Sequence, residues 1–133
     1  MAVMRGQSLF ELNPPRLGYF DVGTLGRFLF FNEYGFTAPD DVEILVSDDS
    51  SCFAFRSDDT LALQFHIDAT ADLLERWTND PIGTEKLLAN GISQNRLLEE
   101  ARQTEDTVTH SVHQLLMPLI DIAKARWSEN RQF

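Results

Sequence analysis

Six aspartates form three adjacent pairs, each in a segment whose composition predicts a turn. They are Asp40, Asp41, Asp48, Asp49, Asp58 and Asp59. Because successive turns of an antiparallel meander alternate between the ends of a sheet, the first and third pairs should converge and the second should lie opposite. Converging carboxylates could bind Mg²⁺ or Ca²⁺, or an Arg- and Lys-rich protein surface. Aspartate also favours turns by itself, so solvated turns are the alternative.

Three histidines are candidates for acid–base or metal chemistry. His110 and His113 lie three residues apart in a helical pattern, with Asp106 one turn earlier, so the three could share a face and bind a metal. No HExxH pattern accompanies them, which favours surface histidines. His66 lies on the polar face of an alternating strand pattern, where it could act as a general base or be an ordinary exposed or interfacial residue.

The one cysteine, Cys52, lies beside aromatic residues and has no adjacent basic residue that would lower its pKa. This context predicts a buried structural thiol. A single cysteine also excludes an internal disulfide, and no zinc-binding spacing is present.

The stretch GTLGRF, residues 23–28, has two glycines three positions apart, directly before an apolar strand. Such spacing lets a backbone approach a ligand or another segment of the chain. A loop that needs positive φ is the structural alternative.

Segments 10–14, 23–31, 33–34 and 37–42 resemble the opening of the ADP-ribosyltransferase-like anti-CRISPR proteins, over roughly residues 9–46. That family combines a first strand carrying a catalytic residue, a GxxGxFLxF loop and a Glu-Tyr pair. The resemblance implies that NAD lies against Gly23, Gly26 and Phe28, with Tyr34 near the nicotinamide. Glu11 takes the place of the family's catalytic histidine.

The resemblance implies a phage or mobile-element protein that antagonises host defence by ADP-ribosylating a basic CRISPR effector subunit. Glutamate at position 11 cannot donate a hydrogen bond as imidazole does, and the strands that carry the family's acidic catalytic residue have no counterpart. Inhibition of the effector by binding alone is therefore as compatible with the sequence as inhibition by ADP-ribosylation. An acidic immunity or antitoxin protein that blocks a basic toxin is the alternative function, and an accessory domain without a ligand is a third.

Charge and hydropathy limit the partners. The 133 residues include 11 Lys and Arg against 21 Asp and Glu, a net charge of -10. This charge disfavours direct contact with nucleic acid and suits either a basic protein partner or solubility. The longest apolar run, residues 28–31, is far shorter than the ~20 residues of a membrane span. Without a signal-peptide pattern at the start, a cytoplasmic protein is expected.

The predicted secondary structure that would position these residues changes from strands to helices near residue 67. Strands are predicted at 8–12, 28–31, 42–46, 52–56 and 61–67, with a glycine-containing loop at 16–27. Helices are predicted from Asp68 or Thr70 to 77, then at 84–89, 93–102 and 104–127, with a kink at Pro118. Residues 128–133 form a polar tail.

This order predicts one α+β domain spanning 1–133, strand-rich at 8–67 and helical at 68–127. Its small sheet should be antiparallel or mixed, because strands precede helices rather than alternating with them.

Overall fold

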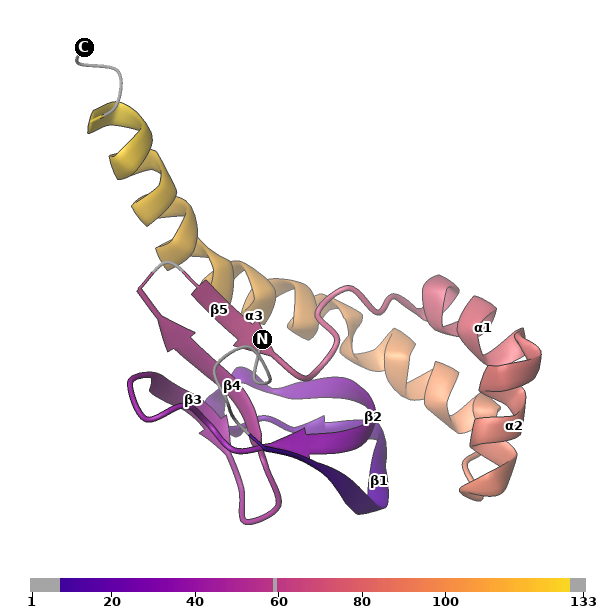
Figure 1. The fold of residues 1–133 in the computed structure, drawn as a ribbon. Helices are drawn as coiled ribbons and strands as arrows, with labels where there is room; N and C mark the ends of the chain where they lie inside the picture. The colour runs from indigo at the N-terminus through magenta and orange to yellow at the C-terminus, as the bar shows by residue number, and fades with distance from the viewer. Residues whose placement is uncertain (1–7, 59, 130–133) are drawn as a thin grey trace.

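The computed structural model describes residues 8–58 and 60–129, in which five strands precede three α-helices. The strands are β1 (Leu9–Asp21), β2 (Arg27–Phe36), β3 (Glu43–Ser47), β4 (Cys52–Ser57) and β5 (Thr60–Leu63), and a short 3-10 helix, η2 (Gly23–Leu25), follows β1. The helices are α1 (Ala71–Asn79), α2 (Pro81–Ala89) and α3 (Gln94–Glu129). The α+β class is confirmed (Figure 1).

A long hairpin of β1 and β2 forms the first sheet. The prediction that the first strand ends before Pro14 and that residues 16–27 form a loop is wrong, because β2 pairs with β1 as far as Asp21. The register shifts between Glu11 and Arg16, where the two prolines lie. Proline has no N–H to donate, so regular hydrogen bonding between the strands is interrupted at these residues and resumes after them.

Strands β3, β4 and β5 form a separate antiparallel meander. The predicted strand at 61–67 ends at Leu63, and His66 instead makes an isolated bridge to Leu29 of the hairpin. The His66 N–H donates to the Leu29 carbonyl at 2.8 Å. This bridge connects the two sheets.

The first part of β2, at Phe28, Leu29 and Phe30, is buried on both faces, as the apolar run predicts. Phe28 and Phe30 point into a cluster that also contains Val22, Phe53, Ala54 and Phe65, here called the Phe28 cluster. Leu29 points the other way, into a cluster with Tyr19, Ala71, Leu74, Leu87, Leu97, Leu98 and Ala101. Each face therefore has its own core, one shared with the second sheet and one with the helices.

Helices α1 and α2 begin at side-chain caps. Thr70 accepts a hydrogen bond from the Leu73 N–H at 3.3 Å, which confirms the predicted cap. Asp80 accepts from the Ile82 N–H at 3.0 Å, and Pro81 is the first residue of α2. The predicted helix at 84–89 therefore starts three residues earlier, because proline fits the first turn, where its missing N–H is not needed.

Helix α3 is one continuous helix of 36 residues, whereas the sequence predicts two. Ser93 caps it as predicted, through the Arg96 N–H at 3.4 Å. Thr104, predicted to cap a second helix, instead donates to the Glu100 carbonyl at 2.9 Å, which is possible only inside a helix. Pro118 lies within α3, and its kink stays a prediction. Ser128 is helical rather than part of a tail, and 130–133 lie outside the described residues.

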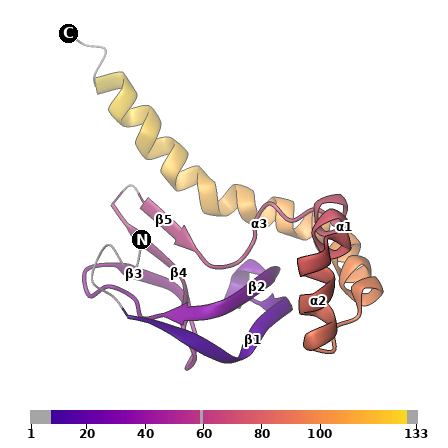
Figure 2. The same ribbon diagram turned by 45° about the vertical axis from the view of Figure 1, so that its right-hand side comes forward.

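The first half of α3 packs across the body, and its second half extends beyond the sheets (Figures 1 and 2). Val108, Val112 and Leu115 contact the Phe28 cluster, and Leu115 is the last α3 residue that packs against any of the described core clusters. Of the helices in the described part of the chain, none is long and apolar enough to cross a membrane.

Candidate functional site

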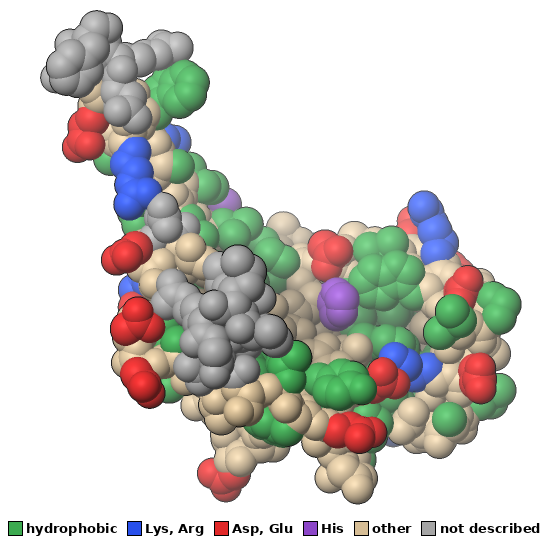
Figure 3. Space-filling model, in the orientation of Figure 1, with side chains coloured by type: hydrophobic (Ala, Val, Ile, Leu, Met, Phe, Trp, Pro, Cys, Tyr) green, Lys and Arg blue, Asp and Glu red, His purple; other side chains and the backbone are tan. Residues whose placement is uncertain are grey.

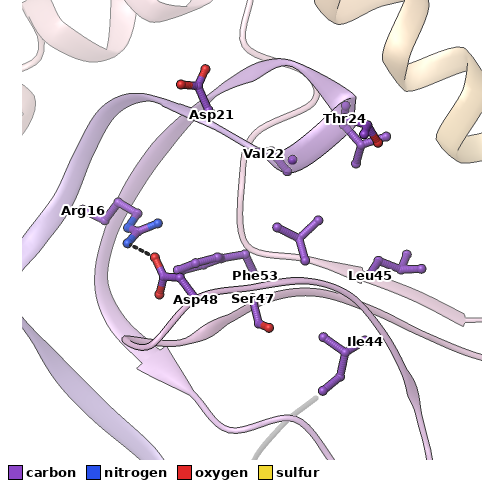
Figure 4. A pocket seen from close by; sticks show the side chains of 12 residues that line it. Arg16, Asp21, Val22, Thr24, Ile44, Leu45, Ser47, Asp48 and Phe53 are labelled. Atoms are coloured by element: carbon purple, nitrogen blue, oxygen red, sulfur yellow. Dashed lines mark hydrogen bonds and ion pairs between the residues drawn. The ribbon is translucent and has the colours of Figure 1, made fainter.

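A cleft opens between the end of β1, the 3-10 helix η2 and strand β3, with a volume of about 360 Å³ (Figure 4). Backbone and side chains from the two sheets surround it, because the hairpin and the meander meet here. Its lining residues are Arg16, Asp21, Val22, Gly23, Thr24, Leu25, Ile44, Leu45, Val46, Ser47, Asp48 and Phe53.

Arg16 provides the positive charge of the cleft. Its guanidinium carbon lies 4.1 Å from the ring centroid of Phe53 and 5.1 Å from that of Phe20. Its Nη2 donates to Asp48 Oδ2 at 2.6 Å and to Ser50 Oγ at 3.2 Å. Aromatic faces attract a cation, so the rings and the carboxylate hold the guanidinium in one position (Figure 4).

Asp48 carries the matching negative charge and is itself held by the turn after β3. Its Oδ1 accepts from the Ser50 N–H at 2.7 Å and from the Ser51 N–H at 3.2 Å. Partial burial by itself would raise the pKa of Asp48, but the hydrogen bonds from Ser50 and Arg16 outweigh it and lower that pKa to about 2. The pair is therefore fully ionised at neutral pH.

Cys52 is the only thiol in the sequence, and it does not line the cleft. It is buried, and its Sγ lies 3.9 Å from the Val46 carbonyl oxygen and 3.7 Å from that of Ala54. Burial raises the pKa of Cys52, which opposes formation of the nucleophilic thiolate. The prediction of a buried structural thiol is confirmed.

The three residues predicted to bind NAD lie in three different environments. Gly23 lines the cleft, and its φ of +50° is in the region that favours glycine. Gly26 has φ +99°, and a Cβ there would lie 3.6 Å from Thr107 of α3, so this glycine faces a helix. Phe28 is fully buried, with its ring centroid 4.7 Å from that of Phe65. In this structure the Phe28 side chain therefore has no surface open to the cleft.

The predicted catalytic residues are far from that loop. Glu11 and Tyr34 are cross-strand partners, and both are exposed. Six residues of β2 separate Tyr34 from Phe28, a distance of about 20 Å along a strand. The hairpin therefore holds the Glu-Tyr pair and the glycine loop at opposite ends. A NAD site formed by both, as the resemblance implies, would have to extend along the hairpin, and NAD binding stays a prediction.

The described aspartates of the acidic pairs lie at the ends of the second sheet that the meander rule predicts. Glu43, which follows Asp40 and Asp41, pairs with Arg56 next to the turn at Asp58, so these aspartates share one end of the second sheet. Asp48 and Asp49 lie at the other end. Asp48 is engaged with Arg16 and is not a freely presented carboxylate, and Asp59 lies outside the described residues. Binding of a basic protein by these aspartates stays a prediction.

In the described part of the chain, the histidines are not brought together into a metal site. His110 contacts Gln114 at 3.1 Å and, like His113 and Asp106, is exposed. Among residues 8–58 and 60–129, no group of three His, Cys, Asp or Glu side chains is placed to hold a metal. The His66 ring lies against Trp77 of α1, with ring centroids 5.0 Å apart, and its Nδ1 lies 3.5 Å from Asp68 Oδ1. Because its backbone bridges to Leu29, His66 links β2 to α1.

Sequence reasoning did not identify Arg16, the central residue of the cleft. It lies in the segment predicted to be a loop, and its partner is 32 residues away. A weak signal was available: Arg16 follows two prolines and precedes Phe20, one of ten phenylalanines, in a chain with few cations. A cation among aromatic residues often rests on a ring face.

Comparison with solved structures identifies the fold. The chain resembles the crystal structure of a glutamine amidotransferase from Thermotoga maritima, with a TM-score of 0.78 and 20% identity over 90% of this chain and 57% of that one. It also resembles a glutamine amidotransferase from Methylobacillus flagellatus, with a TM-score of 0.50 and 14% identity over 61% of this chain and 39% of that one. No family and no curated protein matches the sequence.

These likenesses correct the functional expectations. The fold is similar to glutamine amidotransferase structures and not to the ADP-ribosyltransferase-like anti-CRISPR proteins. The short motifs that carry the other resemblance are built from glycine and phenylalanine, which the hairpin and the core require for structural reasons. The expectation of a phage-encoded antagonist of host defence is therefore wrong, as is the immunity or antitoxin alternative. The chain spans just over half of the Thermotoga structure.

Proposed function

We propose that this domain binds a small zwitterionic α-amino acid in the cleft at Arg16, with L-glutamine as the first candidate, and that it binds without turnover. The observation that carries the proposal is the Arg16–Asp48 pair at the cleft, a guanidinium and a carboxylate held side by side and bonded to each other at 2.6 Å. An α-amino acid carries the complementary arrangement, an ammonium next to a carboxylate. Charge-assisted hydrogen bonds to both groups would fix its orientation.

The remaining walls of the cleft suit the rest of such a ligand. Leu45 and Val46 offer apolar surface to side-chain methylenes. A Cβ on Gly23 would meet no atom within 4 Å, so the backbone there faces open space that a ligand can enter. A volume of about 360 Å³ is at the small end of the range for ligand sites, which fits an amino acid better than a dinucleotide.

The fold likeness supports glutamine as the candidate, because both similar structures are of glutamine amidotransferases. Binding without turnover is supported by Cys52. Amide transfer through a covalent intermediate needs an activated nucleophile at the ligand, and this thiol is buried outside the cleft with a raised pKa.

Isothermal titration calorimetry tests the proposal. We expect L-glutamine to bind with a Kd of roughly 0.1–1 mM, reasonable for about ten non-hydrogen atoms. Glutaramate, which lacks the ammonium, and 4-aminobutanamide, which lacks the carboxylate, should each bind at least about tenfold more weakly. These two ligands test the charge match on the unaltered protein, so the result does not depend on how a variant folds.

Arg16→Met should abolish the heat signal. Arg56→Met is the matched control, because Arg56 donates to Glu43 at 3.0 Å and is not among the residues that line the cleft. The proposal is overturned if no α-amino acid gives a saturable signal. It is also overturned if glutaramate binds as well as L-glutamine.

A further inference from the structure

The hydrogen bonds of Arg16 leave most of its donors unused. A guanidinium has five N–H donors. Nη2 uses its two on Asp48 Oδ2 and Ser50 Oγ, at 2.6 and 3.2 Å, which leaves the donors of Nε and Nη1. These two nitrogens bond to no residue in the described part of the chain, and in Figure 4 the dashed bond leaves a single nitrogen of Arg16. Their donors are therefore available to a ligand.

The surroundings of Arg16 offer these donors no other acceptor. The side chain is 20% exposed, so water reaches only part of it. Its other neighbours are the rings of Phe20, Phe30 and Phe53, whose centroids lie between 4.1 and 5.5 Å from the guanidinium carbon. A phenyl ring has no oxygen or nitrogen atom that accepts a hydrogen bond. Because covered polar groups in proteins are usually hydrogen-bonded, a ligand oxygen at this position would supply the missing acceptor.

Asp48 is in the opposite state, because its acceptor sites are already filled. An ionised carboxylate offers about four such sites on its two oxygens. Oδ1 accepts from the Ser50 N–H at 2.7 Å, from the Ser50 hydroxyl at 2.6 Å and from the Ser51 N–H at 3.2 Å. Oδ2 accepts from Arg16. A ligand ammonium beside Asp48 would gain the attraction of opposite charges, but it would have to displace one of these donors to form a hydrogen bond.

We propose that the carboxylate of the ligand is its anchor, bound by the free donors of Arg16, and that the ammonium contributes less to affinity. This inference rests on the amino-acid binding proposed above and specifies which of the two charged groups dominates. Ser50 is the positioning residue. Its hydroxyl accepts from Arg16 and donates to Asp48, so it occupies a donor of one and an acceptor site of the other. Carboxylates with an amide-bearing chain are therefore the ligand class.

The overall charge of the protein opposes this ranking. The chain has a net charge of -10, and acidic side chains are spread over the face drawn in Figure 3. At long range this charge attracts a cation and repels an anion. If the anionic ligand nevertheless binds more tightly than the cationic one, the difference must come from short-range contacts in the cleft.

Titration followed by ¹H–¹⁵N NMR compares glutaramate, an anion, with 4-aminobutanamide, a cation, on the unaltered protein. The backbone amides of Ser50 and Ser51 report on the site, because both donate to Asp48. We expect glutaramate to bind with a Kd of roughly 1–10 mM, at least about tenfold more tightly than 4-aminobutanamide. Equal affinities, tighter binding of the cation, or no detectable binding of glutaramate each overturn the inference, while binding of L-glutamine leaves the proposed function standing. Absence of L-glutamine binding overturns both.

Two substitutions test the roles of the side chains. Arg16→Lys keeps the charge, but an ammonium has three donors, so bonds to Asp48 and Ser50 leave only one for the ligand. It should weaken glutaramate binding at least about tenfold. Ser50→Ala frees an acceptor site on Asp48, so the preference for glutaramate over 4-aminobutanamide should narrow at least about threefold.

Ser50→Thr is the matched control, because it keeps a hydroxyl and should keep the preference. A merely structural role of Ser50 would lower the free energy of unfolding without changing the ranking of the two ligands. A ranking that neither Arg16→Lys nor Ser50→Ala alters would overturn the proposed anchor.

Discussion

Arg16 and Asp48 form a 2.6 Å ion pair between two residues 32 positions apart. Arg16 belongs to the long hairpin, and Asp48 follows the first strand of the second sheet. The pair therefore joins the hairpin to the second sheet at the edge of the cleft. A structural contact and a candidate binding site are built from the same two side chains.

The pH dependence of stability should reveal this pair. The pKa of Asp48 is about 2 in the folded protein and 3.8 ordinarily, so folding favours its ionised form. Its contribution is complete above pH 3.8 and is lost as the pH falls toward 2. The full shift would correspond to about 2.5 kcal/mol, but the side chain is 43% exposed, so screening reduces our expectation to about 1 kcal/mol.

Asp48→Asn should therefore lower the free energy of unfolding by about 1 kcal/mol at pH 7, measured by urea denaturation, and by almost nothing near pH 2. Asp49→Asn in the same turn is the control and should have little effect at either pH. A difference between Asp48→Asn and the unaltered protein that stays constant over this range would show that the ionised pair does not stabilise the fold.

Phe28 and Tyr34 should respond in opposite ways to truncation. Phe28 is fully buried against Phe65, so Phe28→Ala should cost about 3–5 kcal/mol of unfolding free energy. Tyr34 is 55% exposed, so Tyr34→Ala should cost less than about 0.5 kcal/mol. Chemical denaturation followed by circular dichroism measures both. Equal losses would contradict the separation of these residues into core and surface.

Cys52 should be nearly inert in the folded protein. It is 5% exposed, and burial raises its pKa, so both access and thiolate formation oppose reaction. We expect its rate with a chromogenic disulfide reagent to be at least about 100-fold lower in buffer than in denaturing urea. Fast reaction under native conditions would instead reveal an activated thiol and would favour covalent chemistry.

Local patterns anticipated much of the architecture. The apolar run at 28–31 lies within a strand buried on both faces, and the caps at Thr70 and Ser93 begin helices as expected. These features depend mainly on nearby residues: a hydroxyl caps the helix that follows it, and a short run of large apolar side chains favours burial. The turn placement of the aspartates follows from strand order in the same way.

Two local signals were misleading, each for a physical reason. Pro14 and Pro15 suggested the end of a strand. The hairpin tolerates them at a register shift, because β1 pairs with β2 both before and after the prolines. Thr104 suggested a new helix, but its hydroxyl bonds to a carbonyl one turn back. The conformational preferences of these residues could not decide either case, because the outcome depends on which segments of the chain pack against them.

The sequence by itself determined the α+β order, the anionic exterior and the buried central strand of this protein. Only the tertiary structure decided that Arg16 meets Asp48, that Tyr34 lies far from the glycine loop, and that the second half of α3 extends past the sheets. Periodicity and capping act within a few residues of chain. Contacts between distant segments depend on how whole surfaces pack, which no short window of sequence contains.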